Sequence, residues 1–362
     1  MTGPRPADRL TELGWTAALA ADFAPYAGPH VIPARIAVEH RAAYELVTEA
    51  GEAHASLSGK MRHEAKDKLA LPAVGDWVAF APEGNGGKGT IEALLPRRSM
   101  FVRKAAGKDH GIQIVAANVD IVFLVTSLNA ELSLRRIERY LTLAWESGAQ
   151  PVIILNKADR AADQATQLAE VRTVAGDVPV HVTSALTGNG VETLRAHLQP
   201  HRTGALLGSS GVGKSTLINA LLGFDRQATG KIREGDDKGR HTTTRRELVV
   251  LPGGGILIDT PGMRELQVAD AGEGLLTTFD DIEALAAQCG FGDCTHGPEP
   301  DCAVKAAIAA GTLDAQRLDS YHKLVSEVRH RTVWEDKRAS AEARKHINKK
   351  KGSQGSQGSQ GA

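Results

Sequence analysis

Cysteine, aromatic residues and long apolar runs are all scarce in this 362-residue chain. It has three cysteines, and aromatic residues make up 4% of the sequence. Apolar stretches do not approach the roughly 20 residues of a membrane span, and the Met-Thr-Gly-Pro-Arg start lacks a signal-peptide core. Lys plus Arg and Asp plus Glu both number 43, so the net charge indicates no partner. We therefore expect a cytoplasmic protein that does not enter a membrane.

What the chain does have is a complete phosphate-loop motif. Residues 208–216 read Gly-Ser-Ser-Gly-Val-Gly-Lys-Ser-Thr and match G-x-x-x-x-G-K-[ST]. The motif lies between a short apolar run, Thr203–Leu207, and an apolar helical segment, Leu217–Leu222. We expect Lys214 to reach the β- and γ-phosphates and the Ser215 hydroxyl to bind Mg²⁺. The expected nucleotide contacts are Gly208, Ser209, Ser210, Gly211, Val212, Gly213, Lys214, Ser215 and Thr216.

A second motif predicts that the nucleotide base is guanine. Residues 156–159 read Asn-Lys-Ala-Asp and follow the apolar run Pro151–Leu155. The Asp159 carboxylate can accept from both N1–H and the exocyclic amine of guanine, a donor pair that adenine lacks. This motif is weak alone, since Asn and Asp are common after strands, but it is strong beside a phosphate loop. The expected base contacts are Asn156, Lys157, Ala158 and Asp159, with Ser184, Ala185 and Leu186 after the predicted strand Val178–Thr183.

A third motif, Asp-Thr-Pro-Gly at residues 259–262, follows the apolar run 255–258. Asp259 is placed to hold Mg²⁺ through water, and the N–H of Gly262 is placed to meet the γ-phosphate. Many GTPases have a Gln at the next position, which orients the attacking water. This chain has Met263 there, so the water must be oriented by another residue.

The segment between the phosphate loop and Asp259 predicts a switch that closes on the γ-phosphate. Residues 239–244 read Gly-Arg-His-Thr-Thr-Thr. We expect Thr243 to complete the Mg²⁺ shell, with Thr242 as the alternative. His241 is the nearest residue able to orient a water, although it also fits an ordinary solvated loop residue. The predicted catalytic residues are therefore His241, Thr243 and Lys214.

The order of the motifs is unusual. An ordinary GTPase begins with the phosphate loop, and N-K-x-D falls near the end of the domain. Here residues 156–159 and 184–186 come before the phosphate loop, and the switch and Asp259 come after it. The set is complete but circularly permuted.

All three cysteines surround one histidine in the pattern Cys289-x₄-Cys294-x-His296-x₅-Cys302. Three thiolates and one imidazole satisfy a tetrahedral Zn²⁺ ion and leave no open position. We therefore expect one structural zinc ion per chain. The alternative, a disulfide with one free thiol, fits poorly with a cytosolic nucleotide enzyme.

Hydrophobicity patterns predict a multi-domain α/β protein. Strands that alternate with amphipathic helices from about residue 110, including Val119–Val125 and Ser133–Ser147, predict a doubly wound sheet. Five short strands before them predict an OB-fold barrel: Arg35–His40, Ala43–Glu49, Glu52–Ser58, Asp76–Phe80 and Gly89–Leu95. Three helices are expected after residue 268: Asp280–Ala287, Ala303–Ala310 and Asp314–Arg331.

These patterns also place the domain boundaries. The repeated Gly-Ser-Gln sequence near the end of the chain predicts disorder. The predicted segments are a flexible lead-in (1–33), an OB-fold domain (34–105), a circularly permuted P-loop GTPase domain (106–268), a helical zinc-binding domain (269–348) and a disordered tail (349–362).

Two features have a nucleic-acid interpretation and a plainer alternative. Tyr44, Trp77 and Phe80 could stack on bases or belong to the barrel core. Residues 329–351 contain nine Lys or Arg and three acids, and a second basic cluster comprises Arg97, Arg98, Arg103, Lys104 and Lys108. Both clusters favour a polyanionic partner, although charge runs are usually solvated faces.

The chain resembles the RsgA/YjeQ family. The resemblance rests on the permuted order, the switch at 239–244, the Asp-Thr-Pro-Gly-Met-Arg-Glu run and the cysteine–histidine pattern. Its members are bacterial permuted GTPases that act in maturation of the small ribosomal subunit. The resemblance spans roughly residues 34–330. It implies an OB-fold, a permuted GTPase domain and a zinc domain, and a slow GTPase that the 30S particle stimulates. It also implies contacts with 16S ribosomal RNA, and a catalytic switch histidine that matches His241 where Met263 replaces Gln.

The sequence leaves two rival functions open. One is an RNA-binding assembly factor that carries GTP as a static ligand, and the other is a permuted GTPase of the large subunit. We expect a monomer that binds GTP and GDP and has the 30S particle and its 16S rRNA as partners.

Overall fold

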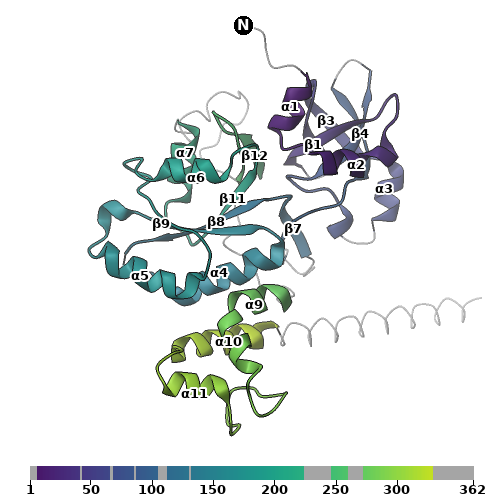
Figure 1. The fold of residues 1–362 in the computed structure, drawn as a ribbon. Helices are drawn as coiled ribbons and strands as arrows, with labels where there is room; N and C mark the ends of the chain where they lie inside the picture. Colours follow the sequence, from purple (N-terminus) through teal and green to yellow (C-terminus); the bar gives the residue numbers. More distant parts are fainter. Residues whose placement is uncertain are drawn as a thin grey trace, which may run out of the picture. The chain divides into compact units, whose positions relative to one another are not determined.

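The computed structural model describes residues 6–40, 43–65, 68–84, 87–104, 112–129, 132–223, 246–259 and 272–328 (Figure 1). The chain forms two compact units, Met1–Gln267 and Val268–Ala362. Each is described by itself below.

The first unit contains a closed five-stranded barrel. The strands follow the order β1-β2-β3-β5-β4, and β4 pairs back onto β1. The β3–β5 pair is parallel and the others are antiparallel, which is the topology of an OB-fold. The strands are β1 (Ile32–Glu39), β2 (Tyr44–Thr48), β3 (Gly51–Leu57), β4 (Trp77–Glu83) and β5 (Lys88–Leu94). The predicted OB-fold is therefore confirmed.

Alternating side chains of these strands fill the barrel. In β2, buried residues alternate with half-exposed ones, as expected when one face of a strand is covered. The barrel core contains Ile36, Leu46 and Ile91. Tyr44, Trp77 and Phe80 are 6%, 2% and 1% exposed, so the three aromatic residues belong to the core and not to a base-stacking surface.

The prediction of a flexible lead-in was wrong for residues 6–33. Helices α1 (Pro6–Glu12) and α2 (Ala17–Phe23) pack against the barrel, and η1 (Ala24–Tyr26) follows them. Trp15 lies edge-on to Trp77, with ring centroids 4.8 Å apart. The lead-in is ordered because it buries an apolar set against Trp77, Ala79 and Leu95 of the barrel, namely Leu10, Leu13, Leu19 and Phe23.

A second set of strands forms the doubly wound part of the first unit. Its order is β10-β9-β8-β11-β13-β12, in which β12 is antiparallel and the others are parallel. The strands are β8 (Ile121–Ser127), β9 (Gln150–Asn156), β10 (Val180–Val182), β11 (Thr203–Leu207), β12 (Glu247–Val250) and β13 (Ile256–Asp259).

Helices cover both faces of these strands, as predicted. Figure 1 shows α4 and α5 on one side and α6 and α7 on the other. Phe123, Ile154 and Leu206 from the strands pack with Leu194 and Leu217 from α6 and α7 in one buried cluster. The helices are α4 (Leu134–Ser147), α5 (Gln164–Ala175), α6 (Val191–His197) and α7 (Lys214–Leu222).

The barrel and the doubly wound strands belong to one 11-stranded sheet, because β12 pairs with β1. A separate antiparallel pair, β6 (Met100–Lys104) and β7 (Ile112–Ala117), links the two parts along the chain. Neither feature was predicted from the sequence.

The second unit is helical in its described part. It contains α9 (Gly272–Thr278), α10 (Asp280–Ala286), α11 (Ala303–Ala309) and a helix at residues 315–328. Phe279 and Ile282 are fully buried. Arg317 pairs with Asp281 through both carboxylate oxygens, at 2.5 and 2.8 Å, and lies 5.0 Å from the centre of the Phe279 ring.

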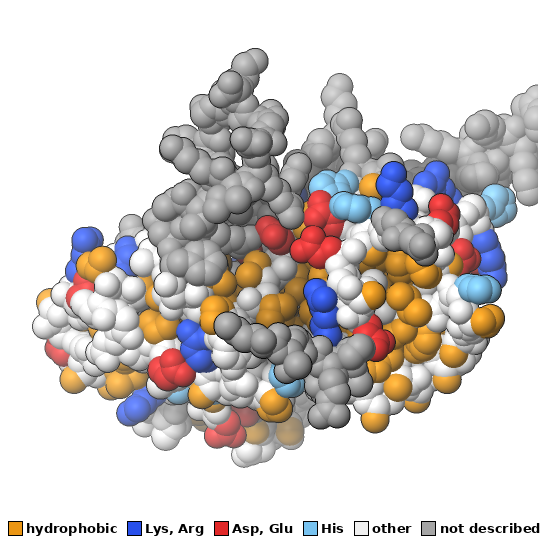
Figure 2. Space-filling model, turned by 90° about the horizontal axis from the view of Figure 1, so that it is seen from above, with side chains coloured by type: hydrophobic (Ala, Val, Ile, Leu, Met, Phe, Trp, Pro, Cys, Tyr) orange, Lys and Arg blue, Asp and Glu red, His pale blue; other side chains and the backbone are white. Residues whose placement is uncertain are grey.

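Across the residues that the structure describes, no helix is long and apolar enough to cross a membrane. The face drawn in Figure 2 carries Lys, Arg, Asp and Glu side chains interspersed with one another. Among the described side chains on this face (Figure 2), basic residues do not form one large continuous patch.

Candidate functional site

The predicted nucleotide motifs meet at one edge of the doubly wound sheet. Residues 156–159 begin at the end of β9, the phosphate loop follows β11, and Asp259 ends β13. These three strands are parallel. Since the carboxyl ends of parallel strands lie at the same edge, motifs that are far apart in the sequence lie beside one another.

The phosphate loop needs glycine at two positions. A Cβ atom on Gly208 would lie 2.2 Å from the Val125 carbonyl oxygen. Gly213 has φ of +98°, and a Cβ there would lie 2.3 Å from Nδ2 of Asn156. Larger residues at either position would displace the backbone whose N–H groups must approach the phosphates.

Lys214 is the first residue of α7, and its side chain folds back over the loop. Its Nζ atom donates to the carbonyl oxygens of Gly208 and Ser209, at 2.7 and 2.6 Å. Ser215 and Thr216 follow in the first turn of α7 and are exposed. The loop thus presents an ammonium group, a hydroxyl group and a helix N-terminus together, which is the chemistry that a polyphosphate with its metal ion requires.

Asn156 connects the guanine motif to two other segments. Its Nδ2 atom donates to the Val212 carbonyl at 2.9 Å, inside the phosphate loop. Its Oδ1 atom accepts from the Thr183 hydroxyl at 3.2 Å and from the Ala185 N–H at 3.0 Å. The side chain is 1% exposed. Asn156 was predicted as a base contact, and its position is that of a buried brace between the loops.

Asp159 and Ser184 form the polar side of the predicted base pocket. The Ser184 hydroxyl donates to Oδ1 of Asp159 at 2.5 Å, and this bond lowers the pKa of Asp159 below its ordinary value. Lys157 adopts a left-handed backbone conformation with φ of 63°, which turns the chain between Asn156 and Asp159. Leu186 is 73% exposed, so its apolar side chain is accessible to a base.

Tyr140 is a residue that the sequence motifs did not predict. It lies on α4, is 8% exposed, and its hydroxyl is 3.3 Å from the Ser209 hydroxyl in the phosphate loop. Its sequence context is only that of an amphipathic helix. No spacing rule ties α4 to the phosphate loop, so the contact could not be predicted.

Several predicted residues lie outside the described part of the chain. They are His241, Thr242, Thr243, Gly262 and Met263, and their roles remain predictions. Asp259 is described and partly buried at the end of β13. Its neighbour across the antiparallel β12–β13 ladder is Glu247.

The cysteine–histidine pattern closes into one cluster in the second unit. Nδ1 of His296 lies 3.7 Å from Sγ of Cys289, and 3.5 Å from Sγ of both Cys294 and Cys302. Sγ of Cys289 and Cys302 are 3.9 Å apart. All three cysteines are free, so the disulfide alternative is not adopted. The four ligand atoms lie within 4.8 Å of one another and could hold a metal ion.

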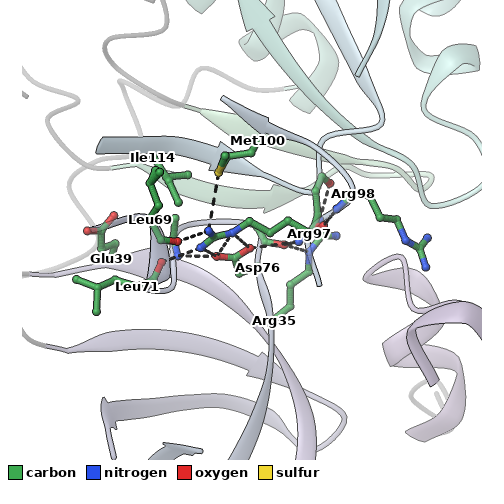
Figure 3. A network of polar contacts seen from close by, with 12 residues as sticks. Arg35, Glu39, Leu69, Leu71, Asp76, Arg97, Arg98, Met100 and Ile114 are labelled. Carbon is green, nitrogen blue, oxygen red and sulfur yellow. Dashed lines mark hydrogen bonds and ion pairs between the residues drawn. The ribbon is translucent and has the colours of Figure 1, made fainter. Parts of the chain in front are cut away.

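The basic cluster near residue 97 is not a free cationic surface. Arg97 forms an ion pair with the fully buried Asp76, at 2.7 Å, and donates to the carbonyls of Leu69 and Leu71 (Figure 3). Arg98 extends away from this network in Figure 3. The Arg97 guanidinium is therefore bonded to groups within its own domain. An RNA interface in this cluster would depend on the other basic residues.

A profile of the RsgA GTPase family matches residues 94–269. The small ribosomal subunit biogenesis GTPase RsgA of Opitutus terrae is 50% identical over 327 residues, which cover 88% of this chain and 89% of the relative. The chain belongs to the RsgA GTPase family. RsgA of Streptomyces coelicolor is 46% identical over 344 residues, which cover 94% of this chain and 92% of that relative.

Solved structures agree with this assignment. YjeQ from Thermotoga maritima matches with a TM-score of 0.62 and 31% identity, covering 82% of this chain and 98% of YjeQ. YloQ, described as a circularly permuted GTPase, matches with a TM-score of 0.60 and 25% identity, covering 84% and 96%. An ABC transporter profile also matches residues 191–351, a range that contains the phosphate loop.

Proposed function

We propose that this protein hydrolyses GTP and that its nucleotide state controls its binding to the immature small ribosomal subunit. One observation carries the nucleotide part of the proposal. The buried Asn156 side chain holds the phosphate loop and the 184–186 loop on either side of the guanine motif. Because these hydrogen bonds hold the base-binding and phosphate-binding loops in one site, the two loops can contact a single guanine nucleotide together.

The hydrolytic roles follow from the chemistry of the residues. Lys214 would neutralise charge on the β- and γ-phosphates, and the Ser215 hydroxyl is an oxygen ligand of the kind that Mg²⁺ prefers. The Asp259 carboxylate would hold the ion through water. The magnesium ion would supply charge stabilisation at the phosphates. We assign the remaining magnesium contact to Thr243, the γ-phosphate contact to Gly262, and the orientation of water to His241.

We propose zinc as the ion of the cysteine–histidine cluster. Zn–S bonds of about 2.3 Å and a Zn–N bond of about 2.0–2.1 Å place tetrahedral ligands about 3.8 Å apart for S···S and about 3.5 Å for S···N. The measured separations include 3.9 Å for one S···S pair and 3.5–3.7 Å for the S···N pairs. Four protein ligands leave no position for a substrate, so the ion would be structural.

The ribosomal part of the proposal comes from the family. The curated relatives are named small ribosomal subunit biogenesis GTPases, and the barrel has the fold of many oligonucleotide-binding domains. We propose that a monomer contacts 16S rRNA within the 30S particle in the cytoplasm. Apart from the lead-in, whose helices pack on the barrel, the domain boundaries predicted above belong to the same proposal.

Two measurements test the proposal. Co-sedimentation with 30S and 50S particles, in GDP and in a non-hydrolysable GTP analogue, should show nucleotide-dependent binding to 30S alone. GTP turnover should rise when 30S particles are added. Binding without stimulated turnover would indicate an assembly factor with a static nucleotide, and binding to 50S would indicate the large-subunit rival.

A further inference from the structure

The barrel reaches the proposed magnesium site through two strand pairings that share one residue. Val38 on β1 pairs with Glu247 on β12, and Glu247 pairs with Asp259 on β13. A barrel residue and the magnesium carboxylate are therefore separated by a single strand. A displacement of β1 would be carried to Asp259 through backbone hydrogen bonds.

The β1–β12 pairing is short, and a side-chain ion pair holds it in place. Arg246, directly before β12, donates from Nη1 to Oε2 of Glu39 at 3.3 Å and to the Ile114 carbonyl at 2.7 Å. The Arg246 side chain is 11% exposed and that of Glu39 is 30% exposed. A slip of one residue in this pairing would turn each side chain of β12 to the opposite face of the sheet. The ion pair therefore opposes such a slip.

The burial of Arg246 and Glu39 shifts the pKa of both groups, and each charge opposes the shift of the other. Burial lowers the pKa of Arg246, and the charge of Glu39 acts against that shift. Burial likewise raises the pKa of Glu39, and Arg246 opposes it. Because each charge is partly buried, each depends on the other. Compared with apolar packing, such a pair contributes little net stability. We therefore interpret its role as selecting one arrangement of β12 on the barrel.

The same barrel strand is also anchored to the strand that leads to the phosphate loop. Arg35 on β1 is 2% exposed, and its Nη2 donates to the Thr203 hydroxyl at 2.8 Å, at the start of β11. It also donates to the carbonyls of Leu13, Gly75 and Asn118, and burial lowers its pKa to about 10. Strand β1 is thus attached to β11, which leads to the phosphate loop, and to β12, the neighbour of the strand that ends in Asp259.

We propose that Arg246 and Glu39 are positioning residues for GTP hydrolysis, because they hold β12 on the barrel and so set the position of Asp259. Binding of a partner to the barrel would then act on the magnesium site directly, through β1. The inference rests on the proposed role of Asp259 and adds the route by which the barrel acts on it.

The test compares Mg²⁺ dependence in the full-length protein. Glu39→Gln removes the charge and retains the shape, and Arg246→Met removes the donors and retains the length. We expect the Mg²⁺ concentration for half-maximal turnover at saturating GTP to rise at least about five-fold in both variants. GDP affinity without Mg²⁺ should stay within two-fold of the native value. Arg246→Lys, which keeps the charge, should recover most of the native Mg²⁺ dependence.

Matched controls separate this effect from a general loss of stability. Glu83→Gln removes an exposed barrel carboxylate that accepts from Thr90, and Arg62→Met removes an exposed guanidinium on α3 (Gly59–Glu64). Neither control should change the Mg²⁺ dependence. If Arg246→Met fails to fold, Glu39→Gln alone tests the positioning role. This variant keeps an acceptor oxygen beside Arg246, so we expect it to fold.

Asp259→Asn distinguishes the two possible failures. If this variant raises the Mg²⁺ concentration for half-maximal turnover while Glu39→Gln and Arg246→Met do not, the proposed magnesium site is supported. The positioning role of Arg246 and Glu39 is then overturned. If Asp259→Asn itself leaves the Mg²⁺ dependence unchanged, the proposed magnesium site is wrong.

Discussion

The Ser184 hydroxyl donates a 2.5 Å hydrogen bond to the Asp159 carboxylate and so joins two motifs that are separated by a helix and a strand. The bond fixes the orientation of the group that is proposed to read the guanine edge. Discrimination between bases depends on this geometry, because a displaced carboxylate cannot meet both guanine donors at once.

Asp159→Asn should exchange the base preference. The amide presents a donor where guanine requires an acceptor, so we expect GTP affinity to fall by about 100-fold or more and xanthine nucleotides to bind. Asp163→Asn is the matched control, since Asp163 caps α5 through the Thr166 N–H. Nucleotide titrations would measure both variants. Equal affinity of the native protein for ATP and GTP would contradict the assignment.

Ser184→Ala should shift the pH dependence of GTP binding. The serine bond lowers the pKa of Asp159, so the anionic carboxylate persists as the pH falls and is lost only below that lowered pKa. Without the hydroxyl, the pKa rises toward its ordinary value. GTP affinity should then begin to fall at a higher pH than in the native protein. Titrations between pH 3.5 and 7 of both proteins test this, and superimposable profiles would refute it.

Lys214→Ala and Ser215→Ala should each abolish hydrolysis, because they remove phosphate neutralisation or a magnesium ligand. Turnover is measured with and without 30S particles. Lys88→Ala, an exposed lysine on the barrel, serves as the control and should remain active. Near-native turnover in either loop variant would place the active site elsewhere.

Purified protein should contain one equivalent of zinc, and Cys294→Ala should lose it. The metal contributes folding energy, so the second unit should unfold at a lower temperature while GTP affinity stays within about two-fold of native. Elemental analysis and thermal unfolding measure the two effects, with His63→Ala as a control for histidine content. Metal-free native protein with an intact second unit would overturn the zinc proposal.

His241→Ala should remove most of the 30S-stimulated GTPase rate while GTP binding and 30S association persist. Orienting the nucleophile is worth roughly 10²–10⁴-fold in rate, and Met263 cannot replace it. Single-turnover measurements with saturating 30S particles give the loss, and His30→Ala serves as the control. A stimulated rate within a few-fold of native would make His241 an ordinary loop residue.

The proposed function could largely be predicted from the sequence, because the chemistry of the site depends on residue types at short, fixed spacing. The phosphate loop, residues 156–159 and the four cysteine–histidine ligands are local patterns. In the structure, residues 156–159 lie beside the phosphate loop, and the four cysteine and histidine residues form one cluster. The five barrel strands were also predictable, since alternating burial leaves a period of two along the chain.

Tertiary structure alone decided how these pieces are joined. Asn156 bonds to Val212, Arg97 to Asp76, and β12 pairs with β1 across a large sequence separation. Such contacts leave no spacing signature, because any segment of suitable shape and polarity could supply the partner. For the same reason, nothing in the sequence indicated that the N-terminal helices cover Trp77 of the barrel. Packing between distant segments exists only once the chain has folded.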